Sequence, residues 1–271
     1  MLAVLKTVAL VVVALYAAVL ALLYAFQNRL LYPSAGVDPA PRPGELAASG
    51  LAPWSGHEGA LIAAPDAARA TAVVFHGNGG TAAARGYYAD ALRARGLRVI
   101  LVEYPGYGGR AGDVSEAALV ADAREAIRQA HAAFGGPVLV WGESLGAGVA
   151  AAAVRQLDVP VEAVVVLTPW DALPNVAQAA YPFVPVRALL RDRYDSSDNL
   201  RGFDGRIAVL VAEADRVIPA PHGLALHRQL AEAAPGRVRL WTFPGAGHNT
   251  WPARPSAGWW DEVVAFALGE A

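Results

Sequence analysis

The sequence predicts an α/β fold, in which a mostly parallel central sheet carries helices on both faces and one N-terminal transmembrane helix precedes it. Three observations lead to this prediction. From residue 71 onward, short apolar runs alternate with segments of helical pattern. Strands that are apolar on both faces are typical of parallel sheets covered by crossover helices. The first thirty residues are almost entirely apolar, and neither an internal repeat nor a second linker divides the remainder.

The N-terminal segment has the length and composition of a membrane anchor. Thr7 to Phe26 contains twenty residues and no charge, and a helix of that length spans about 30 Å, the thickness of a bilayer core. A cleaved signal peptide and a buried core helix are the alternatives. The residues that follow, Gln27 to Tyr32, offer no small-residue cleavage site. We therefore expect an uncleaved single-pass anchor over residues 1–30.

Membrane orientation depends on very few charges. The amino terminus and Lys6 lie on one side of the apolar run and Arg29 lies on the other. Positive charge favours the cytoplasmic side, so the balance slightly favours a catalytic domain outside the cytoplasm.

Residues 31–56 form a proline-rich lead-in to the domain. Five prolines lie between Pro33 and Pro53, together with several Gly, Ser and Ala residues, and this composition is typical of an irregular linker. Because no second linker follows, we expect one catalytic domain at residues 57–271.

Six apolar runs are predicted to be the strands of the sheet. The first is short, rich in β-branched residues and followed by a glycine-rich turn, and turns or helices bound the others in the same way. The six runs are Thr71–His76, Leu97–Val102, Pro137–Trp141, Val161–Leu167, Arg206–Ala212 and Arg237–Phe243.

Helical segments separate these strands. One follows the first strand and runs to about Arg95. The next opens at Asp113 to Glu116, which resembles a capping box, and runs to about Phe134. An alanine-rich helix follows the third strand and runs to about Gln156. The last two helices cover about Pro221 to Ala233 and Ser256 to Leu268.

Composition excludes several kinds of site. The chain has no cysteine, which excludes disulfides, thiolate metal sites and a cysteine nucleophile. None of its six histidines forms an HExxH pair or another compact metal-binding spacing. The formal net charge is −2, whereas nucleic-acid binding usually requires a basic face. We expect no metal, no cofactor and no nucleic-acid partner.

The most specific motif is a GxSxG sequence at Gly142 to Gly146, centred on Ser144. It lies between an apolar strand and a helix, which is the context in which a tight turn lifts a nucleophilic serine above a sheet. A side chain at either glycine would collide with the neighbouring strand or helix. The amide of Leu145 then lies at a helix N-terminus beside the nucleophile, where it can bind a developing oxyanion.

A serine nucleophile requires a base, and the base requires an orienting acid. His248 follows the last strand in a glycine-rich loop, whereas His222 and His227 lie in a helical pattern and are expected to face solvent. Asp215 follows the strand that ends at Ala212, and the order Ser, Asp, His agrees with that expected for a nucleophile elbow. Asp171 and Glu213 are the alternative acids.

The second oxyanion donor is expected from the loop after the first strand, His76 to Gly80. Glycines there allow close approach to a substrate, and the amide of Asn78 is the predicted donor. His76 is expected to be structural, with hydrogen bonds inside the loop. Gly77 to Ala82 also fits a dinucleotide-binding fingerprint, with Glu103 about twenty residues later, but that alternative does not explain the downstream Ser, Asp and His.

Four aromatic residues near these loops are candidates for the wall of a substrate pocket: Trp170, Trp251, Tyr104 and Tyr107. Plain packing is the alternative for each. The 38 residues between the strands that end at Leu167 and begin at Arg206 are too few for a large lid domain. They are expected to form one or two helices beside the site, as a wall for an apolar acyl group.

From about residue 57 to 271 the chain resembles the α/β-hydrolase superfamily. More narrowly, it resembles a small N-terminally anchored branch that includes depalmitoylases and bud-emergence-type, serine-aminopeptidase-like hydrolases. The residues that carry the resemblance are FHGNGG (75–80), EYPGYG (103–108), GESLGAG (142–148), LLRDRYDS (189–196), ADRVIP (214–219) and GAGHN (245–249). Two departures stand out: the first strands are expected to be short, and Arg110 replaces a small polar residue.

The resemblance implies Ser144, Asp215 and His248 as a catalytic triad and an acyl ester or thioester as substrate. It therefore predicts a serine hydrolase that works through an acyl-enzyme intermediate at a membrane. A serine peptidase or amidase uses the same acyl-transfer chemistry and is the first alternative. A catalytically idle, membrane-bound scaffold is the second.

Overall fold

A computed structural model describes residues 1–33, 46 and 49–270 of the chain. One eight-stranded sheet forms its centre, in the order β1-β2-β4-β3-β5-β6-β7-β8. The strands are β1 (Ala52–Pro53), β2 (Leu61–Ala63), β3 (Ala70–Phe75), β4 (Leu97–Val102), β5 (Val138–Glu143), β6 (Ala163–Leu167), β7 (Arg206–Ala212) and β8 (Val238–Phe243).

The sheet is parallel from β4 to β8, and only the two short strands at its edge are antiparallel. Every residue of β3, β5 and β6 is buried, as expected for strands covered on both faces. The predicted α/β fold with a mostly parallel sheet is confirmed, and the first two strands are as short as expected.

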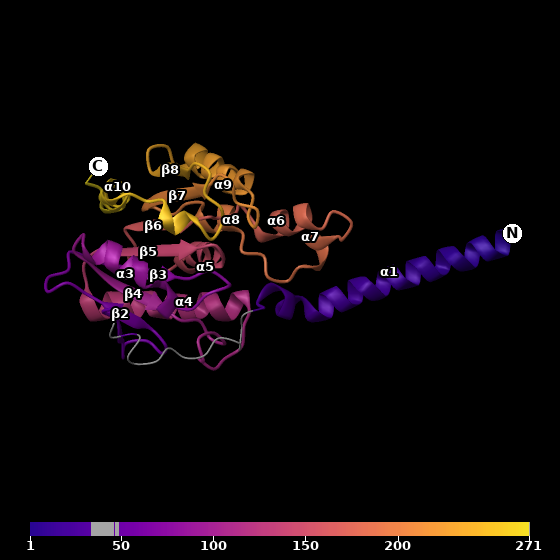
Figure 1. The fold of residues 1–271 in the computed structure, drawn as a ribbon, viewed down its shortest axis with the longest axis horizontal. Coiled ribbons are helices and arrows are strands. Elements are labelled where there is room, and N and C mark those ends of the chain that lie inside the picture. Colours follow the sequence, from indigo (N-terminus) through magenta and orange to yellow (C-terminus); the bar gives the residue numbers. More distant parts are fainter. Residues whose placement is uncertain (34–45, 47–48, 271) are drawn as a thin grey trace.

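Helices cover both faces of the sheet (Figure 1). One apolar core contains buried residues of α4 (Glu116–Phe134), α5 (Leu145–Val154) and α9 (Ala220–Ala233). A second core, on the opposite face, contains buried residues of α3 (Gly86–Arg93) and α10 (Ala257–Leu268). Two short 3-10 helices, η1 (Ala83–Arg85) and η2 (Trp251–Ala253), complete the loops on that second face.

Local sequence explains where the helices begin and end. Ser115 caps α4 by accepting a hydrogen bond from the amide of Ala118, and Ser256 caps α10 in the same way through Trp259. The capping serine of α4 lies at the third position of the predicted motif. Gly269 ends α10 in the left-handed conformation with φ 74°, where a residue without Cβ avoids steric cost.

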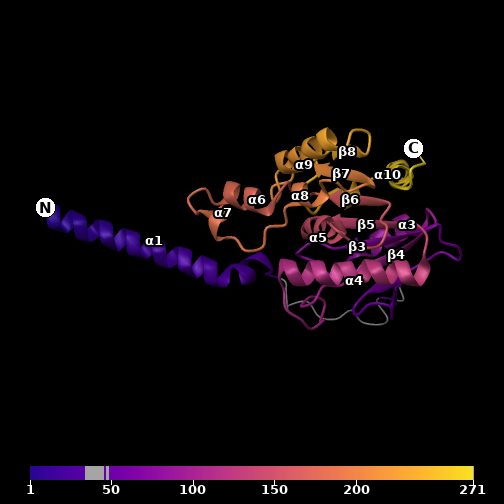
Figure 2. The same cartoon turned by 180° about the vertical axis from the view of Figure 1, so that it is seen from behind.

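The segment between β6 and β7 forms three short helices rather than one or two. They are α6 (Leu173–Ala180), α7 (Val186–Leu189) and α8 (Ser196–Leu200). With only four and five residues, α7 and α8 are too short to show a helical repeat in sequence. Figure 1 and its reverse view, Figure 2, show α6 and α7 standing out from the sheet toward α1.

The N-terminal helix α1 (Leu2–Leu31) is continuous over 30 residues and extends away from the domain (Figure 2). Its most apolar stretch has a mean hydropathy of 2.7 and no buried residue, so by length and composition it is a candidate membrane span. Its last turn is different, because Gln27 is buried against the domain. The lead-in predicted at residues 31–56 lies largely outside the described residues.

Candidate active site

Ser144 lies on the sharp turn between β5 and α5. Its backbone has φ 55° and ψ −114°, a region that costs energy for a residue with Cβ and is found at strained nucleophile elbows. The Ser144 amide donates to the carbonyl of Leu167 on the neighbouring strand β6 at 2.9 Å. The turn is therefore held from both sides, and the side chain is directed above the carboxyl end of the sheet.

The two glycines of the motif are required by close backbone contacts. A Cβ on Gly142 would lie 2.1 Å from the carbonyl oxygen of Gly146, and a Cβ on Gly146 would lie 2.1 Å from the carbonyl oxygen of Phe75 on β3. Neither contact can be relieved by a flexible side chain, since backbone atoms form both. The structure thus supplies the physical reason for the GxSxG spacing that the sequence displays.

The three residues predicted as a triad come together above the sheet. The Nε2 atom of His248 lies 3.0 Å from the Ser144 hydroxyl oxygen, and its Nδ1 atom lies 2.7 Å from Oδ2 of Asp215. A carboxylate can only accept hydrogen bonds, so Nδ1 donates to it and Nε2 is left to accept the serine proton. This is the arrangement needed to make a hydroxyl nucleophilic.

Backbone amides hold the Asp215 carboxylate in place. Its Oδ1 atom accepts hydrogen bonds from the amides of Val217 and Ile218, both at 2.8 Å. The side chain is 1% exposed, whereas that of His248 is 13% exposed. One carboxylate oxygen is thus fixed by the chain and the other is directed at the imidazole, which fixes the ring orientation.

The alternative acids lie elsewhere. Asp171 accepts a hydrogen bond from Asn175 at 2.5 Å and contacts Nδ1 of His222 on α9 at 3.0 Å. The helical pattern predicted that His222 faces solvent. This prediction is wrong, because its side chain is only 16% exposed. Glu213 is exposed to solvent. Burial lowers the pKa of His227, which is half-buried on the same helix.

The loop from His76 to Gly80 lies directly beside the nucleophile. A Cβ on Gly77 would be 3.4 Å from both the Cβ of Ser144 and the carbonyl oxygen of Glu143. Among the described residues, the amides of Asn78 and Leu145 donate no hydrogen bond to the protein. Their role as donors to a developing oxyanion is compatible with this and stays a prediction.

Side chains fix this loop from below. His76 contacts the Gly77 carbonyl through Nδ1 and Oε1 of Glu103 through Nε2, both at 2.8 Å. The other Glu103 oxygen accepts from the Ala82 amide at 2.9 Å. The predicted structural role of His76 is consistent with these contacts. Glu103, the acidic residue of the dinucleotide fingerprint, is engaged in the loop.

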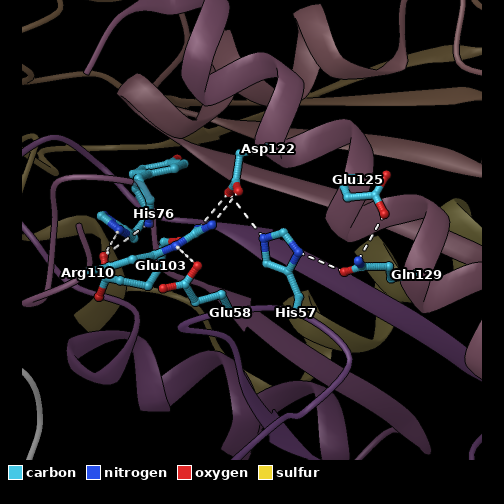
Figure 3. Close-up of polar contacts among 9 residues, drawn as sticks. His57, Glu58, His76, Glu103, Arg110, Asp122, Glu125 and Gln129 are labelled. Carbon is cyan, nitrogen blue, oxygen red and sulfur yellow. Dashed lines mark hydrogen bonds and ion pairs between the residues drawn. The ribbon is translucent and has the colours of Figure 1, made fainter. Parts of the chain in front are cut away.

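A polar network continues from this loop to α4 (Figure 3). Arg110 donates to the Glu103 carbonyl at 2.7 Å and forms two hydrogen bonds with Asp122 on α4. His57 contacts the same carboxylate at 3.2 Å and Gln129 at 2.8 Å. Burial raises the pKa of Asp122, but hydrogen bonds from His57 and Arg110 outweigh it, so the pKa lies below its usual value.

Besides the pair of Arg110 and Asp122, a second buried ion pair, Arg85 and Glu143, lies beside the turn of Ser144. Sequence reasoning missed it. Glu143, next to the nucleophile, accepts hydrogen bonds from Arg85 at 3.2 Å and from the Tyr87 hydroxyl at 2.6 Å. Burial, followed by the nearby Glu143 charge, raises the pKa of Tyr87. A charged residue inside an otherwise apolar strand and turn was the available signal, since buried charges are normally paired.

The four aromatic residues predicted as a pocket wall are packing residues instead. Trp251 is fully buried in the second core, where it packs against Phe243. Trp170 is 5% exposed and donates to the Tyr194 carbonyl at 2.9 Å. Of the two alternatives given for these tryptophans, a pocket wall and plain packing, their burial in the core favours packing.

Tyr104 and Tyr107 require the same correction, since both are fully buried. The Tyr104 hydroxyl donates to the His76 carbonyl at 2.9 Å, and the Tyr107 hydroxyl donates to Oδ1 of Asn78 at 2.6 Å. They support the oxyanion loop from beneath rather than line a pocket.

The C-terminal end of α1 also contacts the site. The Asn78 side-chain amide donates to the carbonyl of Leu31 at 2.6 Å. Tyr32, which is buried, donates to Asp192 at 2.6 Å and lies 3.0 Å from the Tyr194 hydroxyl. The end of α1 and the residue after it thus pack against the folded domain.

Comparisons with known families and sequences show what the chain is similar to. The family described as Serine aminopeptidase, S33 matches residues 66–195. An uncharacterized Mycobacterium tuberculosis protein is 36% identical over 65% of this chain and 62% of its own length. The Lysophosphatidylserine lipase ABHD12 of Xenopus tropicalis is 29% identical over 59% of this chain and 46% of its own length. The chain thus spans less than two thirds of these relatives.

Solved structures share the fold. An esterase from Thermogutta terrifontis, solved with butyrate bound, has a TM-score of 0.60 at 20% identity, over 78% of this chain and 88% of the esterase. A Pyrococcus furiosus esterase has a TM-score of 0.59 at 14% identity, over 76% of this chain and 83% of the other. At these identities the likenesses show that the fold is shared.

Proposed function

We propose that this chain, which matches the Serine aminopeptidase, S33 family over residues 66–195, is a membrane-anchored serine hydrolase of the α/β-hydrolase superfamily that cleaves acyl esters or thioesters. The observation that carries the proposal is the hydrogen-bonded relay from Asp215 through His248 to Ser144. Ser144 has a strained backbone and contacts an imidazole that a buried carboxylate holds in place. A serine in an ordinary turn has neither feature.

In the first half of the reaction, the Ser144 oxygen attacks the acyl carbonyl carbon while Nε2 of His248 takes the hydroxyl proton. The carbonyl oxygen becomes an oxyanion, which the amides of Asn78 and Leu145 bind. As the tetrahedral intermediate collapses, the bond to the leaving group breaks and His248 gives that group its proton. The alcohol or thiol departs, and the acyl group remains on Ser144 as an ester.

In the second half, water replaces the leaving group. His248 takes a proton from water as the water oxygen attacks the acyl-enzyme, and it returns that proton to the Ser144 oxygen when the intermediate collapses. Asp215 stabilises the imidazolium that forms in both halves and keeps the ring in the required tautomer. The products are a carboxylic acid and the regenerated serine, so neither a metal nor a cofactor takes part.

The substrate class in this proposal is a lipid-like acyl ester or thioester. The lipase and esterase names of the relatives support it, as does the apolar helix that would hold the site near a bilayer. A single membrane span by α1 belongs to the same proposal. The excess positive charge of the amino terminus and Lys6 over Arg29 supports a catalytic domain on the non-cytoplasmic side.

The test is activity-based labelling followed by turnover. A fluorophosphonate probe is expected to label the full chain in detergent, and Ser144→Ala is expected to abolish the labelling. Hydrolysis of p-nitrophenyl butyrate should fall by at least a thousandfold in Ser144→Ala and in His248→Ala. Labelling that persists in Ser144→Ala would overturn the assignment of the nucleophile. An unlabelled wild-type chain without turnover would support the idle scaffold.

A peptidase is the second candidate, because the matching family is described as a serine aminopeptidase. The same relay serves amide cleavage, so geometry does not separate the two activities. Kinetic measurements on one preparation with both amino-acid p-nitroanilides and acyl esters separate them. A higher kcat/KM on p-nitroanilides than on esters would favour the peptidase.

A further inference from the structure

An apolar cavity separates the end of α1 from the segment that contains α6 and α7. Its volume is about 340 Å³, within the size range of small-molecule sites. Leu23, Leu30 and Leu31 line it from the anchor helix, and Val184, Val186 and Leu190 line it from the opposite side. A membrane helix and the catalytic domain thus share one apolar cavity.

Specific hydrogen bonds hold the two walls together. Gln27 donates to the Leu189 carbonyl at 3.2 Å and accepts from the Arg191 amide at 2.8 Å. The Arg191 guanidinium donates to the Tyr24 carbonyl at 2.7 Å and lies 4.7 Å from the centre of the Tyr24 ring. The cavity is therefore a feature of the packed chain and not a gap between independent parts.

The loop between α6 and α7, residues 181–185 and here called the tip, lies beside the middle of α1. The Tyr16 hydroxyl donates to the carbonyl of Phe183 at 2.7 Å. Tyr16 lies fifteen residues before Leu31, which is about 22 Å along a helix at 1.5 Å per residue. If α1 spans a bilayer, the tip lies at the depth of the hydrocarbon, beside α1 as Figures 1 and 2 show.

The tip has the properties required of backbone at that depth. Phe183 is 88% exposed and Tyr181 is 62% exposed, so large apolar surfaces face outward. Buried in lipid, carbonyls need internal partners, and the Gln178 side-chain amide contacts the carbonyls of Tyr181, Pro182 and Val184 at 3.2, 3.5 and 3.0 Å. Proline contributes no amide that needs a partner, and two of the tip residues are prolines.

The inner end of the cavity adjoins the catalytic loop. Leu31, which lines the cavity, accepts the hydrogen bond from the Asn78 side chain. If the carbonyl end of an acyl chain lay at Leu31, it would lie next to the loop of Asn78, and the tail would extend along α1.

We propose that this cavity binds the acyl chain of a membrane lipid, which enters sideways from the bilayer past Phe183, with the anchor helix as one wall. The inference rests on the proposed function, since it names the substrate's source and the place of its tail. It assigns α1 a part in substrate binding beyond attachment.

The first test fills the cavity without altering the triad. Ala177 on α6 lines the cavity, whereas Ala179 on the same helix is exposed and lies outside it. Full-length Ala177→Trp is expected to lower kcat/KM for p-nitrophenyl palmitate at least tenfold and to change that for p-nitrophenyl butyrate less than threefold. Ala179→Trp is the matched control and should change neither. Thermal melts confirm that each variant is folded.

The outcomes separate this inference from the proposed function. Absence of butyrate turnover in the wild-type chain would overturn the proposed function itself. Turnover of both esters by the wild type, with palmitate unaffected in Ala177→Trp or both esters reduced equally, would overturn only the acyl site. Conversion of a wild-type dimer to a monomer by Ala177→Trp would also overturn it and would indicate that a second copy fills the cavity.

The second test measures the depth of the tip, and the absence of cysteine makes it direct. The single variant Phe183→Cys, labelled with an environment-sensitive NBD dye in phosphatidylcholine vesicles, should show quenching by lipids spin-labelled on the acyl chain. Asp204→Cys is the control, since that side chain is fully exposed in a distant turn. Equal, water-like emission from both positions would overturn the entry route.

Discussion

At the residue scale, side chains of the candidate site are held by hydrogen bonds from two directions. Asp215 is directed at His248 by two amides on its other oxygen. Asn78 donates through its side chain to Leu31 and accepts from Tyr107, which leaves its amide for an oxyanion. A side chain held from two directions loses little further entropy when a transition state forms.

The choice between the two acids can be decided by a matched pair of variants. Asp215→Asn is expected to lower kcat for p-nitrophenyl butyrate by about 10⁴-fold, because an amide favours the wrong imidazole tautomer. Asp171→Asn alters only contacts with Asn175 and His222, outside the relay, and should keep kcat within about threefold. Steady-state kinetics on both folded variants measures the difference. The reverse order of effects would show that the assigned acid is incorrect.

Asp122 gives a prediction about stability and pH. Its lowered pKa means that it stabilises the fold above the unfolded-state pKa of about 3.9 and that this contribution is lost as pH falls through the folded-state value. Asp122→Asn is expected to lower the free energy of unfolding at pH 7 by about 2–4 kcal/mol, and by progressively less as the pH falls below 4.

Urea unfolding of the detergent-solubilised chain at pH 7, 5 and 3 measures the Asp122 effect. Asp158→Asn is the control, because Asp158 is also paired with an arginine, Arg128, but on the exposed surface. It should change stability little at any pH. A loss for Asp122→Asn that stays constant between pH 7 and pH 3 would contradict the linkage.

At this scale, chain order and strand ends were sufficient to predict Ser144, Asp215 and His248 as neighbours. Their side chains follow strands whose carboxyl ends meet at one edge. Whether an aromatic ring lines a pocket or packs in the core is harder to predict from sequence. Trp251 and Tyr107 lie in or near the loops of the site, and only packing determines that their surfaces are buried. The Asp171–His222 contact, between residues 51 apart, is likewise set by how α9 packs.

At the scale of elements, the strand-turn-helix unit β5–Ser144–α5 positions the nucleophile. Its bounds follow from sequence because an apolar β-branched run, a glycine-flanked turn and an alanine-rich helix differ sharply in composition. The predicted and observed strands agree within two residues or fewer at each end for β3, β4, β5, β6, β7 and β8. Prediction fails for α7 and α8, which are defined by tertiary contacts and not by periodicity.

The elbow predicts a difference between two glycine substitutions. In Gly146→Ala, the new Cβ would lie 2.1 Å from the Phe75 carbonyl oxygen, so β3 and α5 must separate and stability should fall by about 3 kcal/mol or more. In Gly258→Ala on α10, the nearest atom is 3.9 Å away, and stability should be unchanged or slightly raised. Thermal unfolding monitored by circular dichroism compares them. Equal stability of the two variants would contradict this account.

At the scale of the whole molecule, the anchor and the catalytic domain are one packed unit. The apolar composition of α1 predicts its membrane segment, but the sequence does not reveal where the membrane segment ends and the domain begins. Gln27 and Leu31 continue the helix while they contact Leu189 of α7 and Asn78. Tyr32, the residue after the helix, contacts Asp192 beyond α7. Such contacts join residues more than forty positions apart, and local composition carries no information about them.

Two truncations test this unity. Removal of residues 1–22 should keep the melting temperature of the domain, because the contacts from Tyr24 onward remain and only the exposed hydrogen bond from Tyr16 to Phe183 is lost. Removal of residues 1–33 also deletes buried Tyr32, which we expect to cost about 2–3 kcal/mol and to lower the melting temperature by about 6–12 °C. Differential scanning fluorimetry of both proteins in detergent gives the comparison. Identical melting curves would show that the anchor is merely tethered.

The contact between Leu31 and Asn78 has a kinetic consequence. A flexible tether would let the domain tumble and sample dissolved molecules from the surrounding solution. If α1 spans the bilayer as proposed, a stiff joint at the loop of Asn78 instead fixes the angle at which Ser144 meets the lipid surface. On the proposed function, turnover then depends on the surface mole fraction of substrate among its neighbouring lipids. Inert phospholipid would slow hydrolysis by two-dimensional dilution even when the total amount of substrate in the tube is constant.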